Sequence, residues 1–281
     1  MVELFHTQCG QLSWVVILLA ELWLTVDSDD FRHLPRNQGH PTRSRNHGTT
    51  KTTPPSIRLK KGMVGFSNWH LEKPQERAAT IFVIADQLRD EEFRMWIQKL
   101  LSKSNYITVA CHGLHHRSWS AWGEDIEGFR KALNQAKVEI QGHVGKAWRP
   151  WFRAPAGYVA PWMSRVLADE GFTVDTSVNP SFLVRRKAGK GNSWNKVETA
   201  MEDVGIVERP WLTSSIGPAC GPALHIPILR SFARRAWRQV SKLPLASERS
   251  ITEVGAEVVT VYWHLHDHAR SNGKWTPPLI R

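Results

Sequence analysis

Short apolar runs recur along the chain, separated by longer stretches in which apolar residues return every three or four positions. Such short runs are typical of strands buried on both faces of a parallel sheet. We predict strands at 23–26, 79–84, 106–110, 151–153, 207–211 and 257–263. The helical spacing between them predicts helices at about 62–70, 93–101, 126–142 and 162–171.

This alternation of strands and helices indicates parallel βα units of an α/β protein. Polar residues repeatedly follow the predicted strand ends, and a βα barrel has its active site at that rim. At 281 residues, the chain is long enough for one large α/β domain or two small ones. We assign 22–281 to a single barrel domain, in which 31–61 is a polar insertion rich in Arg, His, Pro, Thr and Gly.

Residues 1–21 form an N-terminal apolar segment whose main run, 12–20, ends at Glu21. The run is shorter than a membrane span requires. It also lacks the positive start and the small-residue cleavage site of a signal peptide. We interpret it as a buried helix or strand, with an uncleaved membrane anchor as the alternative. This pattern does not assign a compartment.

The composition adds a net charge of +11 and an isoelectric point near 9.9. A basic chain can attract nucleic acid, an anionic membrane or an acidic polymer. No zinc-finger, RNP or helix-turn-helix pattern accompanies the charge, so we expect no specific nucleic-acid partner. The three cysteines have the spacing of neither a disulfide framework nor a CxxC metal site. The fourteen tryptophans suit either a sugar-binding cleft or a protein core.

The first candidate site follows the first predicted strand and contains Asp27, Asp29 and Asp30. Crowded carboxylates repel one another unless a metal ion or an arginine neutralises them. A solvated turn is the alternative interpretation.

A second motif follows the third predicted strand and contains three histidines, His112, His115 and His116. Histidines four residues apart lie on one face of a helix, so His112 and His116 can bind a single ion. In that geometry His115 points elsewhere.

A third motif begins at Arg153 and continues through Pro155 and Gly157. A fixed cation, a rigid proline and a glycine make a loop that can hold an acidic partner and present backbone N–H groups. This short string has little specificity by itself.

The last motif contains His264, His266 and His268, after the final predicted strand. Alternate residues of a strand share one face, so these histidines lie on one side if the strand continues. One of them can titrate near neutral pH and act as a general acid.

In this order, the four motifs resemble those of the polysaccharide deacetylases of the NodB-homology type (carbohydrate esterase family 4). The strings at 79–84 and 171–177 are also similar to stretches of that family. The resemblance runs from about Leu22 to His268, and it implies an irregular (β/α) barrel of about seven strands. It also implies removal of N-acetyl or O-acetyl groups from a polysaccharide or oligosaccharide that contains N-acetylglucosamine.

The resemblance further implies a divalent metal, zinc above all, with one carboxylate and two histidines as ligands. The histidines would be His112 and His116, and the carboxylate would be Asp29 or else Asp30. Two imidazoles and one carboxylate leave open positions on the ion, where a water can be activated.

The remaining roles concern proton transfer and charge stabilisation. Asp27 would be the general base, Arg153 would orient it, and His264 or His266 would protonate the leaving amine. The oxyanion and substrate loop would comprise Pro155, Ala156, Gly157 and Tyr158, with the Ala156 N–H facing the oxyanion.

The chain departs from the family pattern at several points. Three aspartates lie in the first motif, which leaves the metal ligand open, and Gly113 stands where Ser or Thr is usual. The alternative functions are a catalytically inactive carbohydrate-binding barrel and a basic nucleic-acid-binding protein. Neither the oligomeric state nor the compartment follows from the sequence.

Overall fold

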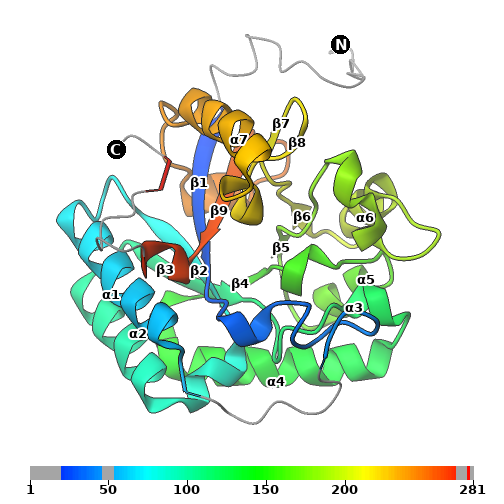
Figure 1. The fold of residues 1–281 in the computed structure, drawn as a ribbon. Coiled ribbons are helices and arrows are strands. Elements are labelled where there is room, and N and C mark those ends of the chain that lie inside the picture. The colour runs from blue at the N-terminus through cyan, green and yellow to red at the C-terminus, as the bar shows by residue number, and fades with distance from the viewer. Residues whose placement is uncertain (1–19, 46–53, 270–276, 279–281) are drawn as a thin grey trace.

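The computed structural model describes residues 20–45, 54–269 and 277–278. Its centre is a curled sheet of seven parallel strands in the order β6-β5-β4-β3-β2-β1-β9 (Figure 1). The strands are β1 (Glu21–Asp27), β2 (Ala79–Val83), β3 (Ile107–Cys111), β4 (Trp148–Phe152), β5 (Val174–Asp175), β6 (Val207–Glu208) and β9 (Val258–His264). This sheet confirms the α/β class and the irregular barrel of about seven strands, in the form of a curled half-barrel.

The sheet forms because its central strands are apolar on both faces. Leu22, Leu24 and Val26 of β1 join the larger hydrophobic cluster, whereas Trp23 between them joins a second, smaller one. In that smaller cluster the Trp23 ring meets the Trp151 ring edge-on, with the centroids 5.3 Å apart. Burial of each such side chain contributes about 1.5–3 kcal/mol, which explains why these short runs form strands without alternating polarity.

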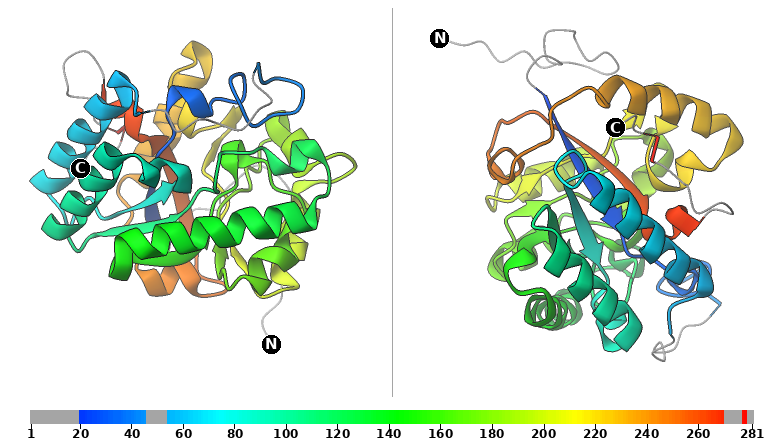
Figure 2. Two further views of the ribbon diagram at one scale, coloured as in Figure 1. Left: turned by 90° about the horizontal axis from the view of Figure 1, so that it is seen from below. Right: turned by 90° about the vertical axis from the view of Figure 1, so that its left-hand side faces the viewer.

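Helices flank the sheet as expected for βα units. In Figure 1 and Figure 2, α1 and α2 line one flank, α5 and α6 line the other, and α4 runs across the base. The helices are α1 (Ile57–Glu72), α2 (Glu91–Lys103), α3 (Trp119–Trp122), α4 (Ile126–Val144), α5 (Met163–Asp169), α6 (Trp194–Glu202), α7 (Pro227–Val240) and α8 (Glu248–Thr252). Helices α6 and α7, the two-residue β5 and the hairpin of β7 (Thr213–Ser214) and β8 (Gly217–Pro218) are not among the predicted elements.

The segment that follows β6 connects that edge of the sheet to the other edge, at β9, through a β-bridge and side-chain hydrogen bonds. Trp211 makes an isolated parallel bridge with Thr260 of β9. The Arg209 guanidinium donates hydrogen bonds to the carbonyls of Ile251 and Ala256, at 3.0 and 2.6 Å. These contacts tie the chain after β6 to β9 and to the loop before it.

The first helix is longer than the predicted one. It begins at Ile57, where the Ser56 hydroxyl accepts a hydrogen bond from the Leu59 N–H at 3.1 Å. Its first turn therefore lies within the segment assigned to the polar insertion. The part of that insertion described at 31–45 forms the short helix η2 (Phe31–His33) and turns.

A glycine lets α1 approach the segment that follows β9. A Cβ on Gly62 would lie 2.3 Å from the carbonyl oxygen of Leu265, far inside van der Waals contact. This close approach packs α1 against the short helix η8 (Leu265–Ala269). It thereby determines where the terminal histidines lie.

Most of the apolar run at 12–20 lies outside the described residues, as does Cys9; only its last residue, Ala20, is described, and it is buried. Within the described part of the chain, no helix combines the length and the apolar character that a membrane crossing requires.

Candidate metal centre and catalytic groups

The polar motifs meet at the carboxyl ends of neighbouring parallel strands (Figure 1). Asp27, the last residue of β1, is in register with His264, the last residue of β9. On the other side, β3 and β4 end in register, so His112 and Arg153 follow side by side. The sheet topology alone therefore brings residues from remote parts of the chain to one edge.

Three buried side chains form a group that can hold a metal ion: Asp29, His112 and His116. The Asp29 carboxylate lies 2.7 Å from His116 Nε2 and 3.3 Å from His112 Nε2. His112 Nδ1 lies 2.8 Å from the backbone carbonyl of Arg153, which fixes a proton on Nδ1 and leaves Nε2 facing the carboxylate. Ligand atoms of all three residues lie within 4.8 Å of one another.

The electrostatic environment of Asp29, His112 and His116 favours a positive charge between them. Burial raises the pKa of Asp29, but His116 and His112 outweigh it and bring that pKa well below its ordinary value. Burial lowers the pKa of His112, but Asp27 and Asp29 together raise it. A positive charge between these groups, carried by protons or by a metal ion, is therefore stabilised.

Unsatisfied polar atoms support a metal ion in this position. Asp29 Oδ2 and both ring nitrogens of His116 are buried and make no hydrogen bond of acceptable geometry with the described residues. Buried polar atoms without partners are rare, because each costs desolvation free energy. Two imidazoles and one carboxylate are a donor set that zinc accepts while keeping an open position, so the residues fit the expected ion.

The two histidines converge by a different route from the predicted one. Residues 112–116 form a loop and not a helix, so the expectation of a shared helical face is wrong. The loop turns back because Gly113 and His116 have positive φ angles of 82° and 54°. His115 points away, with Nδ1 3.4 Å from a carboxylate oxygen of Asp86.

The polar insertion supports this loop. The Ser118 N–H donates to the carbonyl of Gly39 at 2.8 Å. A Cβ on Gly39 would lie 2.3 Å from the carbonyl oxygen of His116, so the two backbones are in direct contact. The His33 ring packs against His116 with centroids 5.7 Å apart. Part of the insertion is thus a structural support for His116.

Asp30 lies outside the group. Its carboxylate accepts hydrogen bonds from the N–H groups of Phe31 and Ser56, both at 2.7 Å, and from the Ser56 hydroxyl at 2.5 Å. Both oxygens of Asp30 therefore hold the start of η2 and α1 in place. Of the two aspartates, the structure brings Asp29 to the histidines.

Asp27 forms a buried ion pair with Arg153, whose Nη1 lies 2.6 Å from the carboxylate. The Arg153 guanidinium also donates to the Thr25 hydroxyl at 2.7 Å and to the Thr176 carbonyl at 3.1 Å. The second oxygen of Asp27 lies 3.9 Å from His112 Nε2. Arg153 thus holds Asp27 beside the candidate metal group.

The loop after Arg153 places a strained residue at the site. Ala156 has φ 53° and ψ 19°, a conformation that alanine rarely adopts. Lys187 Nζ donates a hydrogen bond to the Ala156 carbonyl at 2.7 Å. No described residue accepts a hydrogen bond from the Ala156 N–H, which leaves this donor available to a ligand.

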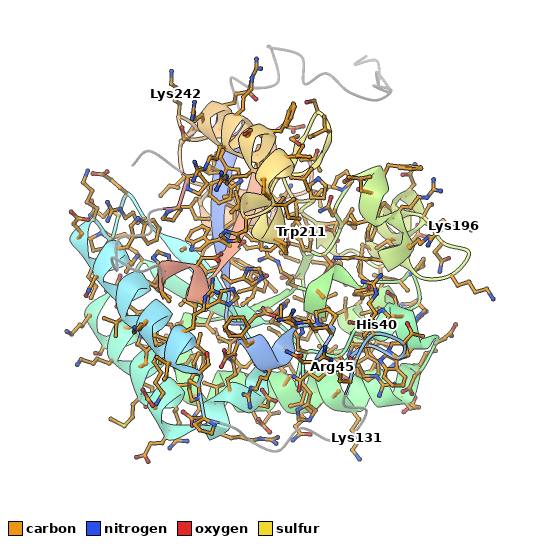
Figure 3. All side chains as sticks on the ribbon, in the orientation of Figure 1. His40, Arg45, Lys131, Lys196, Trp211 and Lys242 are labelled. Carbon is orange, nitrogen blue, oxygen red and sulfur yellow. The ribbon has the colours of Figure 1, made fainter. Side chains whose placement is uncertain are left out.

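The rest of that loop is held by packing. Pro155 is buried, and a Cβ on Gly157 would lie 2.7 Å from the Trp211 ring. Trp211, labelled in Figure 3, is buried. The buried Tyr158 ring meets the His40 ring edge-on, with centroids 5.2 Å apart.

The terminal histidines do not lie on a continued strand, so the condition under which all three would share one face is not met. Strand β9 ends at His264, and η8 follows it. The rings of His264 and His266 stack with centroids 5.0 Å apart. His268 turns into the core, where its Nε2 accepts a hydrogen bond from Trp263 Nε1 at 2.9 Å.

His264 and His266 differ in their electrostatic surroundings. Burial alone lowers the pKa of His264, but the carboxylates of Asp267, Asp29 and Asp27 raise it to about 9. Burial and the neighbouring His264 lower the pKa of His266, whose Nδ1 lies 3.0 Å from the Asp29 backbone carbonyl. At neutral pH, His264 is therefore the protonated one.

Several polar contacts of the site were not among the predicted ones. The Asp267 carboxylate accepts hydrogen bonds from His225 Nε2 at 2.8 Å and from the His264 N–H at 3.0 Å. Asp267 lies within the terminal histidine motif, so its position in the sequence could have indicated a functional role. The sequence does not single out Lys187 or Thr25 as site residues. Lys187 lies in a basic stretch, and Thr25 lies in a buried strand.

Comparisons with known proteins bear on the fold. No model of a known protein family and no curated protein matches the sequence. The structure is similar to that of a candidate polysaccharide deacetylase from Mycobacterium smegmatis, with 18% identity, 94% of this chain and 83% of that chain covered, and a TM-score of 0.56. The chain shares its fold with that protein.

Two further structures are similar, at TM-scores below 0.5. One is a family 4 carbohydrate esterase from Streptococcus mutans, with 9% identity, 92% of this chain and 81% of that chain covered, and a TM-score of 0.42. The other is a family 4 carbohydrate esterase from Streptomyces lividans, with 12% identity, 86% and 79% covered, and a TM-score of 0.36. At such identities the likeness concerns the fold alone.

Proposed function

We propose that the protein is a metal-dependent hydrolase that removes acetyl groups from N-acetylglucosamine units of a polysaccharide or oligosaccharide. The observation that carries the proposal is the buried group of Asp29, His112 and His116 next to the Asp27–Arg153 pair. The shared fold with a candidate polysaccharide deacetylase supports a carbohydrate substrate.

The metal would be a divalent ion held by Asp29, His112 and His116, with zinc preferred for this mixture of nitrogen and oxygen ligands. When bound, it would supply Lewis-acid polarisation of the acetyl carbonyl and lower the pKa of the attacking water.

The side chains around it would supply the proton transfers. Asp27, oriented by its ion pair with Arg153, takes the proton of the attacking water. The Ala156 N–H donates a hydrogen bond to the oxygen that becomes negative in the transition state. Asp27 ends strand β1 and Ala156 lies in the segment after β4, at the same edge of the sheet.

His264 is the proposed general acid. The leaving amine must be protonated, and His264 carries a proton at neutral pH because of its neighbouring carboxylates. Asp267, whose carboxylate lies 3.7 Å from His264 Nδ1, orients the ring. His266 has a lowered pKa and is neutral at the same pH, so we assign it a positioning role through its contact with the Asp29 carbonyl.

Acetate release from N-acetyl chito-oligosaccharides tests the proposal. The full-length chain is expected to release acetate in the presence of zinc, to lose this activity on chelation and to regain it when zinc is restored. An inactive carbohydrate-binding barrel would bind the oligosaccharide without releasing acetate. Binding without turnover at any tested divalent metal would remove the proposal.

The pH dependence of kcat tests the role of His264. Its pKa is raised from 6.5 to about 9, so the acid form is present below that pH and is lost above it. We expect kcat to fall on the alkaline side, with the limb at or below about 9, because a metal cation next to Asp29 lowers this pKa. Asp267→Asn removes one of the carboxylates that raise it, so the limb is expected to move to lower pH. An alkaline limb that stays in place in this variant would contradict the assignment.

A further inference from the structure

Helix α7 has one buried side and one exposed side. The buried side chains are Ala233, Ala236, Trp237 and Val240. The Trp237 indole donates a hydrogen bond to the Ala219 carbonyl at 2.8 Å, which anchors the helix. The helix is therefore fixed on the body of the protein, and its exposed side is presented at the surface.

The exposed side of α7 is strongly basic. Its cations, together with the lysine that follows the helix, are Arg230, Arg234, Arg235, Arg238 and Lys242. No Asp or Glu occurs between Glu208 and Glu248 in the sequence. Among the described residues, none of these five cations has an ion-pair partner. Uncompensated charge of one sign on a single helix face indicates an anionic partner.

Exposed apolar side chains accompany the cations. Ile226, Ile228 and Phe232 are 46%, 74% and 39% exposed. A helix that carries arginines together with large apolar side chains on its outer side is typical of helices that lie at a membrane surface. A nucleic acid would engage the charges but leave these apolar side chains in water, so the pattern favours lipid.

The position of α7 supports the same partner. The chain after α7 is hydrogen-bonded to the start of β1: the Leu22 N–H donates to the Pro244 carbonyl at 2.8 Å, and the Ala246 N–H donates to the Leu22 carbonyl at 2.9 Å. The apolar run at 12–20 leads directly into β1. The described structure begins at Ala20, directly before the strand that is bonded to the chain after α7, and Figure 1 shows α7 next to β1.

We propose that the exposed side of α7 docks on the surface of a membrane that contains anionic lipids. The arginines contact the headgroups, and Ile228 and Phe232 enter the boundary of the acyl chains. The end of α7 lies beside the amino end of β1, whereas the start of the helix follows His225, whose ring is hydrogen-bonded to Asp267. This proposal does not rest on the proposed hydrolase activity.

Co-flotation of the full-length chain with lipid vesicles tests it. We expect binding to vesicles of phosphatidylcholine and phosphatidylglycerol, weaker binding at high salt, and little binding to phosphatidylcholine alone. A quadruple variant, R230Q/R234Q/R235Q/R238Q, is expected to lower the partition coefficient on the order of 1,000-fold, at about 1 kcal/mol for each arginine.

The matched control neutralises four exposed cations on other helices. These are Lys99, Lys103, Lys131 and Arg165, each replaced by Gln. Figure 3 shows Lys131 at the opposite end of the molecule from Lys242. The control loses the same formal charge as the quadruple variant, and we expect it to keep most of the vesicle binding. If the two variants lose vesicle binding equally, net charge alone explains the binding, and the proposal is overturned.

A second pair of variants tests the apolar contacts. The double variant I228S/F232S is expected to lower vesicle binding about 10-fold, whereas Val254→Ser, at another exposed apolar residue, leaves it unchanged. Near-ultraviolet circular dichroism establishes that each variant is folded. Undiminished vesicle binding by the quadruple variant, equal binding to neutral and anionic vesicles, or binding of a DNA oligonucleotide but not of vesicles would each overturn the proposal.

Discussion

Replacing His112 with alanine is expected to abolish zinc binding and acetate release together. The change removes one of two imidazoles from a group that offers three ligands, and it leaves Asp29 buried without one of its two neighbouring rings. Loss of the Lewis acid removes the means of activating water, so kcat/KM is expected to fall at least on the order of 1,000-fold. Zinc stoichiometry by metal analysis and acetate release on the same preparation measure the two effects.

His115→Ala is the matched control. This histidine lies in the same loop, but its half-exposed ring is directed towards Asp86 and not towards Asp29. We expect this variant to keep both zinc and activity. Full activity in His112→Ala, or zinc retained at the wild-type stoichiometry, would contradict the proposed centre. His116→Ala should behave like His112→Ala, because both rings lie against the same carboxylate.

Changing Asp27 to asparagine is expected to separate metal binding from catalysis. Asp27 is held by Arg153 at the edge of the metal group, so zinc should stay bound while the general base is lost. Loss of a general base costs roughly 10²- to 10⁴-fold in kcat. Arg153 is fully buried and would lose its charged partner, so the free energy of unfolding should also fall by about 3–5 kcal/mol. Urea unfolding of the zinc-loaded protein measures this second effect.

Asp30→Asn is the corresponding control. Its carboxylate holds backbone N–H groups and the Ser56 hydroxyl, so the variant is expected to lose about 1 kcal/mol of stability and to keep zinc and activity. Zinc loss in Asp30→Asn would show that the wrong aspartate was chosen as the ligand. Normal turnover in Asp27→Asn would remove the general base from the mechanism.

The strand pattern could be predicted because burial on both sides of a parallel sheet demands unbroken apolar runs. The central strands β1, β2 and β3 lie close to their predicted positions for this reason. Polar residues directly after such runs cannot lie inside the sheet, so Asp27 and His112 could be placed at its carboxyl edge. Two-residue strands such as β5 carry no comparable pattern, and the arginines of α7 obscure its few buried positions.

The sequence by itself therefore determined the α/β class, the strand ends and the residue types that could bind a metal. Only the tertiary structure decided that Asp29 and not Asp30 faces His112 and His116, because hydrogen bonds to Ser56 engage Asp30. It also decided that a loop, and not a helix, brings the two histidines together. The physical reason is the same in both cases: the direction of a side chain in a loop depends on positive φ angles and on contacts with distant backbone, which a local pattern of polar and apolar residues does not record.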